Sequence, residues 1–188
     1  MRLIHVFLLT FLSSCDSSSN DYLTEMIKYY KEHSNILHQV EKDFRNNVPK
    51  NYLISFSKVD KEIKVEIYRR DSVNPDSIKL VYQMENLKEN DSVQLLTVAF
   101  KKDFFNRIRL YLLGSEIKSI VGLTPDNSVM MKYTNTGNGG IFEYDLFSET
   151  VSAQSKSFKD SDCSFYKIND SCYIHYLYGF VGNRCINQ

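Results

Sequence analysis

The feature that most constrains the fold of this 188-residue chain is a change in the spacing of its apolar residues near residue 50. Within residues 21–46, apolar side chains recur three, four and seven positions apart, which places them on one face of a helix. From Tyr52 onward apolar and polar residues alternate, most regularly over residues 61–69. Such alternation is typical of an antiparallel strand with one solvated face. One amphipathic helix followed by strands predicts an α+β fold.

Turn signals recur roughly every 8 to 12 residues after the helix, a rhythm typical of a curved, mostly antiparallel β-meander. We expect about eight to eleven strands, with the N-terminal helix packed on the sheet, and no internal repeat is detectable. Gly137-Asn138-Gly139-Gly140 lacks the lysine and hydroxyl of a phosphate-binding loop, so we interpret it as a hairpin loop. The predicted strands are residues 52–57, 61–69, 78–84, 93–100, 117–124, 129–134, 141–147, 151–158, 163–168 and 172–178.

Residues 100–112 fit two patterns. Phe100, Phe104, Ile108 and Leu112 have helical spacing, but residues 107–112 also alternate with period two. Gly114 and Ser115 then separate this segment from a further apolar run at 117–124. We favour a hairpin whose arms are residues 107–112 and 117–124, with a helix as the alternative.

The N-terminus has the three parts of an export signal: Arg2, an apolar run over residues 3–12, and the small residues Ser13 and Ser14. The apolar run has about ten residues, whereas a helix that spans a bilayer needs roughly 20. We therefore predict a cleaved signal peptide over residues 1–14.

The residues Leu12-Ser13-Ser14-Cys15 resemble the lipobox of bacterial lipoproteins, an aliphatic residue and two small residues before a cysteine. The resemblance implies lipid attachment at Cys15, cleavage before it, and two or three acyl chains, which anchor a protein stably where one chain does not. The expected product is a lipid-anchored protein of the bacterial cell membrane that faces the periplasm or the cell exterior. Asp16 leaves the choice between inner and outer membrane open. We expect residues 15–20 to be a flexible tether and residues 21–188 a single domain.

Charge excludes one class of partner. The chain has 23 basic and 23 acidic residues, and loss of residues 1–14 removes one arginine and no acid, which leaves a net charge of −1. A nucleic-acid-binding domain is normally basic, so no nucleic-acid partner and no polybasic membrane patch are predicted.

Three further cysteines, Cys163, Cys172 and Cys185, lie near the C-terminus. Thiols outside the cytosol tend to pair, and three pairings are possible here. We favour Cys172–Cys185, because this disulfide would tie the C-terminal tail to the last strand. Cys172 and His175 are three residues apart, but no second close pair of ligands accompanies them, so no metal and no cofactor are predicted.

No residue is predicted to be catalytic. Glu143 and Asp145 share one face of a strand, and we interpret them as part of its solvated side. His33 and His38 are interpreted as surface or boundary histidines. The best functional prediction is a non-enzymatic binding or scaffolding module whose partner is another envelope protein. Two alternatives remain: a carrier with a small apolar ligand between the helix and the concave face of the sheet, by analogy of architecture alone, and a small hydrolase that uses His175.

Overall fold

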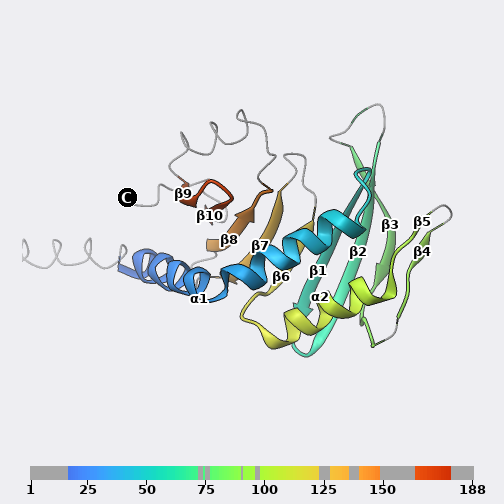
Figure 1. The fold of residues 1–188 in the computed structure, drawn as a ribbon, viewed down its shortest axis with the longest axis horizontal. Helices are drawn as coiled ribbons and strands as arrows, with labels where there is room; N and C mark the ends of the chain where they lie inside the picture. The colour runs from blue at the N-terminus through green and yellow to red at the C-terminus, as the bar shows by residue number, and fades with distance from the viewer. Residues whose placement is uncertain are drawn as a thin grey trace, which may run out of the picture.

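The chain has an α+β fold (Figure 1). The computed structural model describes residues 17–71, 74, 77–89, 91–95, 98–122, 128–135, 140–148 and 164–178. These residues form two helices, an open eight-stranded antiparallel sheet and a separate two-stranded sheet. The predicted α+β class with a large antiparallel sheet is confirmed. The elements are α1 (Ser17–Asn47), β1 (Tyr52–Val59), β2 (Glu62–Arg70), β3 (Ile78–Met84), β4 (Gln94–Leu95), β5 (Val98–Ala99), α2 (Lys102–Gly114), β6 (Ser119–Gly122), β7 (Val129–Asn135), β8 (Gly140–Leu146), β9 (Phe165–Asn169) and β10 (Cys172–Tyr178).

The strand order in the large sheet is β3-β2-β1-β6-β7-β8-β10-β9. A helix followed by a three-stranded meander therefore occurs twice, as α1-β1-β2-β3 and as α2-β6-β7-β8. The first strands of the two units, β1 and β6, pair antiparallel at the middle of the sheet, with Ile54 opposite Gly122. This duplicated element order was not indicated by the sequence, which has no detectable repeat.

Aromatic rings fill the core where the two units meet. Phe44 of α1, Phe56 of β1 and Phe104 of α2 are fully buried. Their ring centroids lie 5.2 to 5.9 Å apart in edge-to-face geometry, which aromatic pairs prefer. A Cβ built on Gly122 would overlap the Phe44 ring, so only glycine lets β6 approach α1 this closely. Further along α1, the buried Tyr144 hydroxyl donates a hydrogen bond to the Met26 carbonyl at 2.7 Å.

Residues 102–114 form a helix, so the favoured hairpin over 107–112 and 117–124 was wrong. Ile108 and Leu112 are fully buried, whereas Leu110 is 57% exposed. Positions 108 and 112 satisfy both a four-residue and a two-residue period, and only position 110 separates the two patterns. A distant side chain stabilises the end of this helix: Lys58 Nζ donates to the carbonyls of Leu112 at 2.8 Å and Ser115 at 2.7 Å.

Four other predictions need correction or lie outside the described residues. The apolar run at 93–100 is not one buried strand but contributes β4 and β5 to the small sheet. Helix α1 begins at Ser17, inside the segment predicted as a tether, because serine is compatible with the first turn of a helix. The predicted strand at 151–158 and the glycine loop at 137–139 lie outside the described residues.

Candidate ligand site between the two helices

A hollow of about 340 Å³ lies on the surface between α1 and α2. Residues of both helices, and the segment that follows α2, form its wall. The lining residues are Tyr29, His33, Ile36, Leu110, Tyr111, Gly114, Ser115 and Glu116. Its volume falls at the lower end of the range that is typical of small-molecule sites.

The rim of the hollow is apolar. Ile36 of α1 is 51% exposed and Leu110 of α2 is 57% exposed, and both line the hollow. A single exposed aliphatic residue is ordinary on a protein surface. Two such residues on the two sides of one hollow provide an apolar surface that a bound molecule could cover.

The floor of the hollow is polar. Tyr111 Oη and Ser115 Oγ are buried, and neither makes a hydrogen bond of good geometry to the described residues. The Tyr29 hydroxyl lies close to both oxygens, and burial raises the pKa of Tyr29 and of Tyr111 above the ordinary value. These phenols therefore stay protonated at neutral pH and can donate hydrogen bonds. Most buried polar atoms in proteins form well-aligned hydrogen bonds, so two hydroxyls in one place that make only poorly aligned contacts with each other and with Tyr29 are a notable departure.

The positions of these side chains follow from the helices. Tyr29, His33 and Ile36 are four and three residues apart, so they share one face of α1, and the rings of Tyr29 and His33 lie 4.3 Å apart. Arg107 of α2 contacts both carboxylate oxygens of Asp43 of α1, at 2.8 and 3.2 Å. This paired contact links the two helices beside the hollow.

The hollow differs from the carrier site expected from the sequence. That site was placed between the helix and the concave face of the sheet, but around Phe44 and Gly122 this space is filled. Sequence reasoning missed Tyr111 and Ser115 because it favoured a strand for residues 107–112. The helical spacing of Phe104, Ile108 and Leu112 was the signal that could have placed Tyr111 on a helix.

The prediction that Glu143 and Asp145 lie on a solvated face was wrong. Glu143 is 9% exposed and Asp145 is 1% exposed, because this side of β8 and β10 has a hydrophobic cluster of its own, formed by Phe147, Phe165 and Tyr173. His175 lies in the same region, with Nδ1 at 3.4 Å from Glu143 Oε1.

His175 does have an acidic neighbour, as the hydrolase alternative required, but its surroundings do not favour catalysis. Its ring stacks on Phe165 at 4.0 Å, and its Nε2 is buried without a hydrogen-bond partner among the described residues. A general base must reach the proton that it removes, and a nitrogen closed off from solvent does not meet this requirement.

Cys172 is a buried free thiol. The structure therefore does not contain the expected Cys172–Cys185 disulfide, and Cys185 itself lies outside the described residues. Burial raises the pKa of the Cys172 thiol well above its ordinary value, and the nearby Asp145 carboxylate adds to this effect. The thiol is thus protonated and a poor nucleophile.

Cys172 and His175 lie on opposite faces of β10, because they are three residues apart on a strand. They can neither share a metal ion nor form a nucleophile–base pair. The described residues hold no group of three or more His, Cys, Asp or Glu side chains that could bind a metal. Cys15, the predicted lipid-attachment residue, lies outside the described residues.

Comparisons with protein-family models, with curated proteins and with solved structures found no match. In the described part of the chain, neither helix has the length and apolar character needed to cross a membrane. A proposal about function therefore depends on the residues of this chain alone.

Proposed function

We propose that this protein is a lipid-anchored bacterial envelope lipoprotein whose folded domain binds a small amphipathic molecule between α1 and α2. The apolar part of the molecule covers Ile36 and Leu110, and binding opens the hollow so that the polar end hydrogen-bonds the hydroxyls of Tyr111 and Ser115, which are closed to solvent in the free protein. The observation that carries the proposal is the pair of buried hydroxyls, without well-formed hydrogen bonds, beneath an exposed apolar rim.

The anchor is supported by the export signal over residues 1–14 and by the lipobox-like residues that end at Cys15. In this proposal, α1 lies along the helix side of the curved sheet. The Tyr144–Met26 hydrogen bond and the close approach of Phe44 to Gly122 support this arrangement. The start of α1 then follows the anchor within a few residues, which keeps the domain close to the membrane surface.

The first prediction concerns the anchor. Cys15→Ala removes the only thiol in the lipobox-like segment, so the protein should lose its lipid and its membrane association, because one or more acyl chains supply the anchoring free energy. Fractionation of cells and mass spectrometry of the intact protein measure both effects. Cys172→Ala is the matched control, since this buried thiol should leave fractionation unchanged. A Cys15→Ala protein that remains lipidated and membrane-bound would contradict the anchor.

The second prediction concerns the hollow. Tyr111→Phe removes a buried hydroxyl that makes only poorly aligned contacts with Tyr29 and Ser115, so the free energy of unfolding should change by no more than about 1 kcal/mol. Retention of the bound molecule should fall roughly two- to tenfold, because one hydrogen bond to it is lost. The measurement is mass spectrometry of small molecules that remain with the full-length protein after purification from its own membrane.

Tyr82→Phe is the control for this experiment, because Tyr82 is a partly buried tyrosine on β3 that does not line the hollow. It should retain as much of the molecule as the unchanged protein. Recovery of a protein partner without any small molecule would favour the scaffolding alternative over ligand binding. A marked loss of stability in Tyr111→Phe would show that the hydroxyl is paired within the protein.

A further inference from the structure

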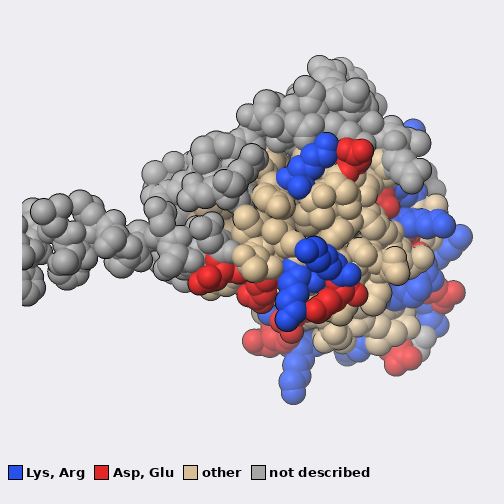
Figure 2. All heavy atoms as spheres, turned by 60° about the vertical axis from the view of Figure 1, so that its left-hand side comes forward, with Lys and Arg blue, Asp and Glu red and all other residues tan. Residues whose placement is uncertain are grey.

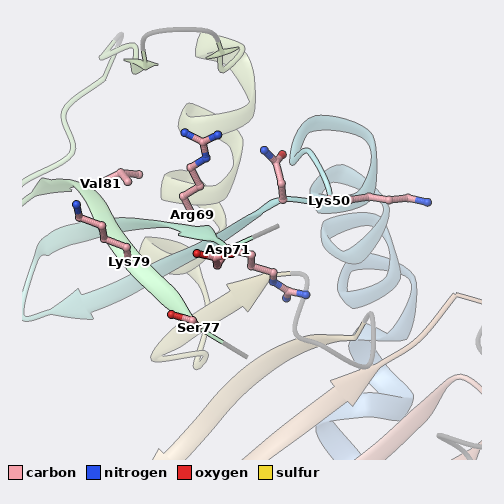
Figure 3. A pocket seen from close by; sticks show the side chains of 8 residues that line it. Lys50, Arg69, Asp71, Ser77, Lys79 and Val81 are labelled. Carbon is pink, nitrogen blue, oxygen red and sulfur yellow. The ribbon is translucent and has the colours of Figure 1, made fainter. Parts of the chain in front are cut away.

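A second concave region lies at the end of the β2–β3 hairpin, away from the hollow between the helices. It is a groove of about 710 Å³, and Figure 3 shows it from close by. Its described lining residues include four basic side chains and one acidic side chain. The lining residues are Lys50, Asn51, Arg69, Arg70, Asp71, Ser77, Lys79 and Val81. The net charge of the whole chain is zero, so this groove concentrates positive charge that the composition does not reveal.

Arg69 and Lys79 form the centre of this charge. They are directly opposite each other on β2 and β3. In Figure 3 both side chains extend to the same side of the strand pair, whereas Lys50 extends outward at the other end of the groove. Like charges directly opposite on neighbouring strands destabilise a sheet. Within the described part of the chain, neither Arg69 nor Lys79 forms an ion pair that offsets this repulsion.

Asp71 is the one acidic residue among the described residues that line the groove, and it is already engaged in local structure. Asp71 Oδ1 accepts a hydrogen bond from the Asn74 backbone N–H at 3.1 Å. The Asp71 backbone N–H donates to the Ser77 carbonyl at 2.9 Å, which closes the turn between the two strands. Asp71 therefore shapes the rim of the groove.

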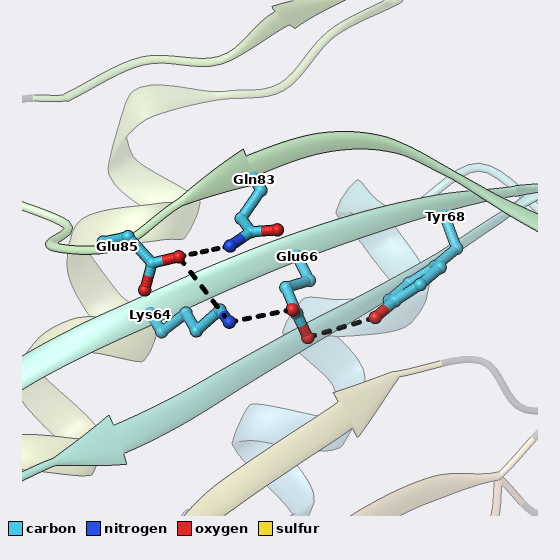
Figure 4. Close-up of polar contacts among 5 residues, drawn as sticks. All are labelled: Lys64, Glu66, Tyr68, Gln83 and Glu85. Carbon is cyan, nitrogen blue, oxygen red and sulfur yellow. Dashed lines mark hydrogen bonds and ion pairs between the residues drawn. The ribbon is translucent and has the colours of Figure 1, made fainter.

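The opposite face of the same two strands shows the ordinary arrangement of charge. Lys64 Nζ lies 3.1 Å from Glu66 and 3.6 Å from Glu85, and Tyr68 donates to Glu66 at 3.1 Å (Figure 4). Basic and acidic side chains are also intermixed on the face of the molecule shown in Figure 2. Charges of opposite sign lie together on these surfaces, whereas Arg69 and Lys79 are two like charges that lie opposite each other.

A β-bulge creates this pair. The register of β2 and β3 shifts after Ile67, which is opposite Tyr82, so that Arg69 is opposite Lys79. In an unbroken register Leu80 would take the place of Lys79. Bulges near functional sites commonly redirect a side chain in this way. The bulge thus places a second cation, instead of an aliphatic residue, beside Arg69.

We propose that this groove binds a phosphate ester, with Arg69 and Lys79 as the groups that pair with its charge. A phosphate monoester carries about −1.5 to −2 charges at neutral pH. It therefore balances the charge of two adjacent cations better than a ligand with one carboxylate group would. The guanidinium group of Arg69 can contact two phosphate oxygens at once, and the Lys79 ammonium contributes a point charge. The amide of Asn51 and the hydroxyl of Ser77 supply further hydrogen bonds at the wall. This proposal does not depend on the hollow between the helices or on the lipid anchor.

The test uses the full-length chain in nanodiscs of phosphatidylcholine, titrated with glycerol 3-phosphate and with inorganic phosphate. Sodium chloride at matched ionic strength is the reference. We expect saturable binding of both phosphates in calorimetry, together with a rise in the midpoint of thermal unfolding that chloride does not produce. In nanodiscs that contain phosphatidic acid, loss of the response to soluble phosphate identifies a lipid headgroup as the source, and an undiminished response identifies a soluble ester. A response no larger than that to chloride would overturn the proposal.

Lys79→Glu provides the sharper test, because binding and stability should change in opposite directions. Phosphate affinity should fall at least tenfold as one cation becomes an anion. The thermal midpoint without phosphate should rise by roughly 1–4 °C, since the new carboxylate would pair with Arg69 across the strands. Lys61→Glu is the matched control: it makes the same charge change on an exposed lysine in the turn of the β1–β2 hairpin, outside the groove. Equal losses of affinity in the two variants would show a general charge effect and reject the groove as the site.

Discussion

Replacing Gly122 by alanine should lower the free energy of unfolding by about 3 kcal/mol, a large fraction of the stability of an ordinary domain. The added Cβ would overlap the Phe44 ring. Phe44 is fully buried between Phe56 and Phe104, with ring centroids at 5.8 and 5.2 Å, so it cannot turn aside without moving them. Urea unfolding of the full-length protein, monitored by circular dichroism, measures the loss.

Gly114→Ala is the matched control for this experiment. Nothing lies within 4 Å of a Cβ built on Gly114, the last residue of α2. Because alanine restricts the unfolded chain more than glycine does, this variant should be neutral or more stable by about 0.5–1 kcal/mol.

A double-mutant cycle then tests the cause of the loss. Phe44→Leu shortens the ring that the new methyl group meets, so the double variant with Gly122→Ala should lose at least about 1 kcal/mol less than the two single losses combined. Additive losses would show that the glycine is required for a reason other than the close approach of α1 and β6.

The parts of the fold that were predicted correctly are those in which local pattern and tertiary position agree. The alternation over residues 61–69 corresponds to β2, whose Ile63, Val65 and Ile67 are buried. The prediction for residues 107–112 was wrong because the helical period and the strand period coincide at Ile108 and Leu112. Tertiary contacts resolved it: Phe104 packs on Phe44 and Phe56, and Lys58 binds the carbonyls at the end of α2.

The candidate sites depend on contacts that no local pattern contains. Tyr111 and Ser115 form the floor of a hollow only because α1 lies beside α2. Arg69 and Lys79 are opposite each other because of a bulge, and a bulge shifts register without leaving a period in the sequence. The burial of Glu143 and Asp145 likewise follows from a second hydrophobic cluster on a face that alternation predicts to be solvated.

Replacing Leu112 by alanine should cost about 2–5 kcal/mol, whereas Leu110→Ala should change the free energy of unfolding by no more than about 0.5 kcal/mol. Leu112 is fully buried against the sheet, and its truncation leaves a cavity beneath α2. Leu110 is 57% exposed, so the same truncation removes little buried surface.

This pair of variants separates the helix from the hairpin, because the two structures place residue 110 differently. On a strand, residues 110 and 112 share one face and would be buried or exposed together, while on a helix they are about 200° apart. Urea unfolding of both variants under identical conditions measures the difference. Similar losses in Leu110→Ala and Leu112→Ala would contradict α2. Without α2, Leu110 would not lie at the rim of the hollow, and the proposed ligand site would lose part of its apolar surface. This comparison should therefore precede any search for the bound molecule.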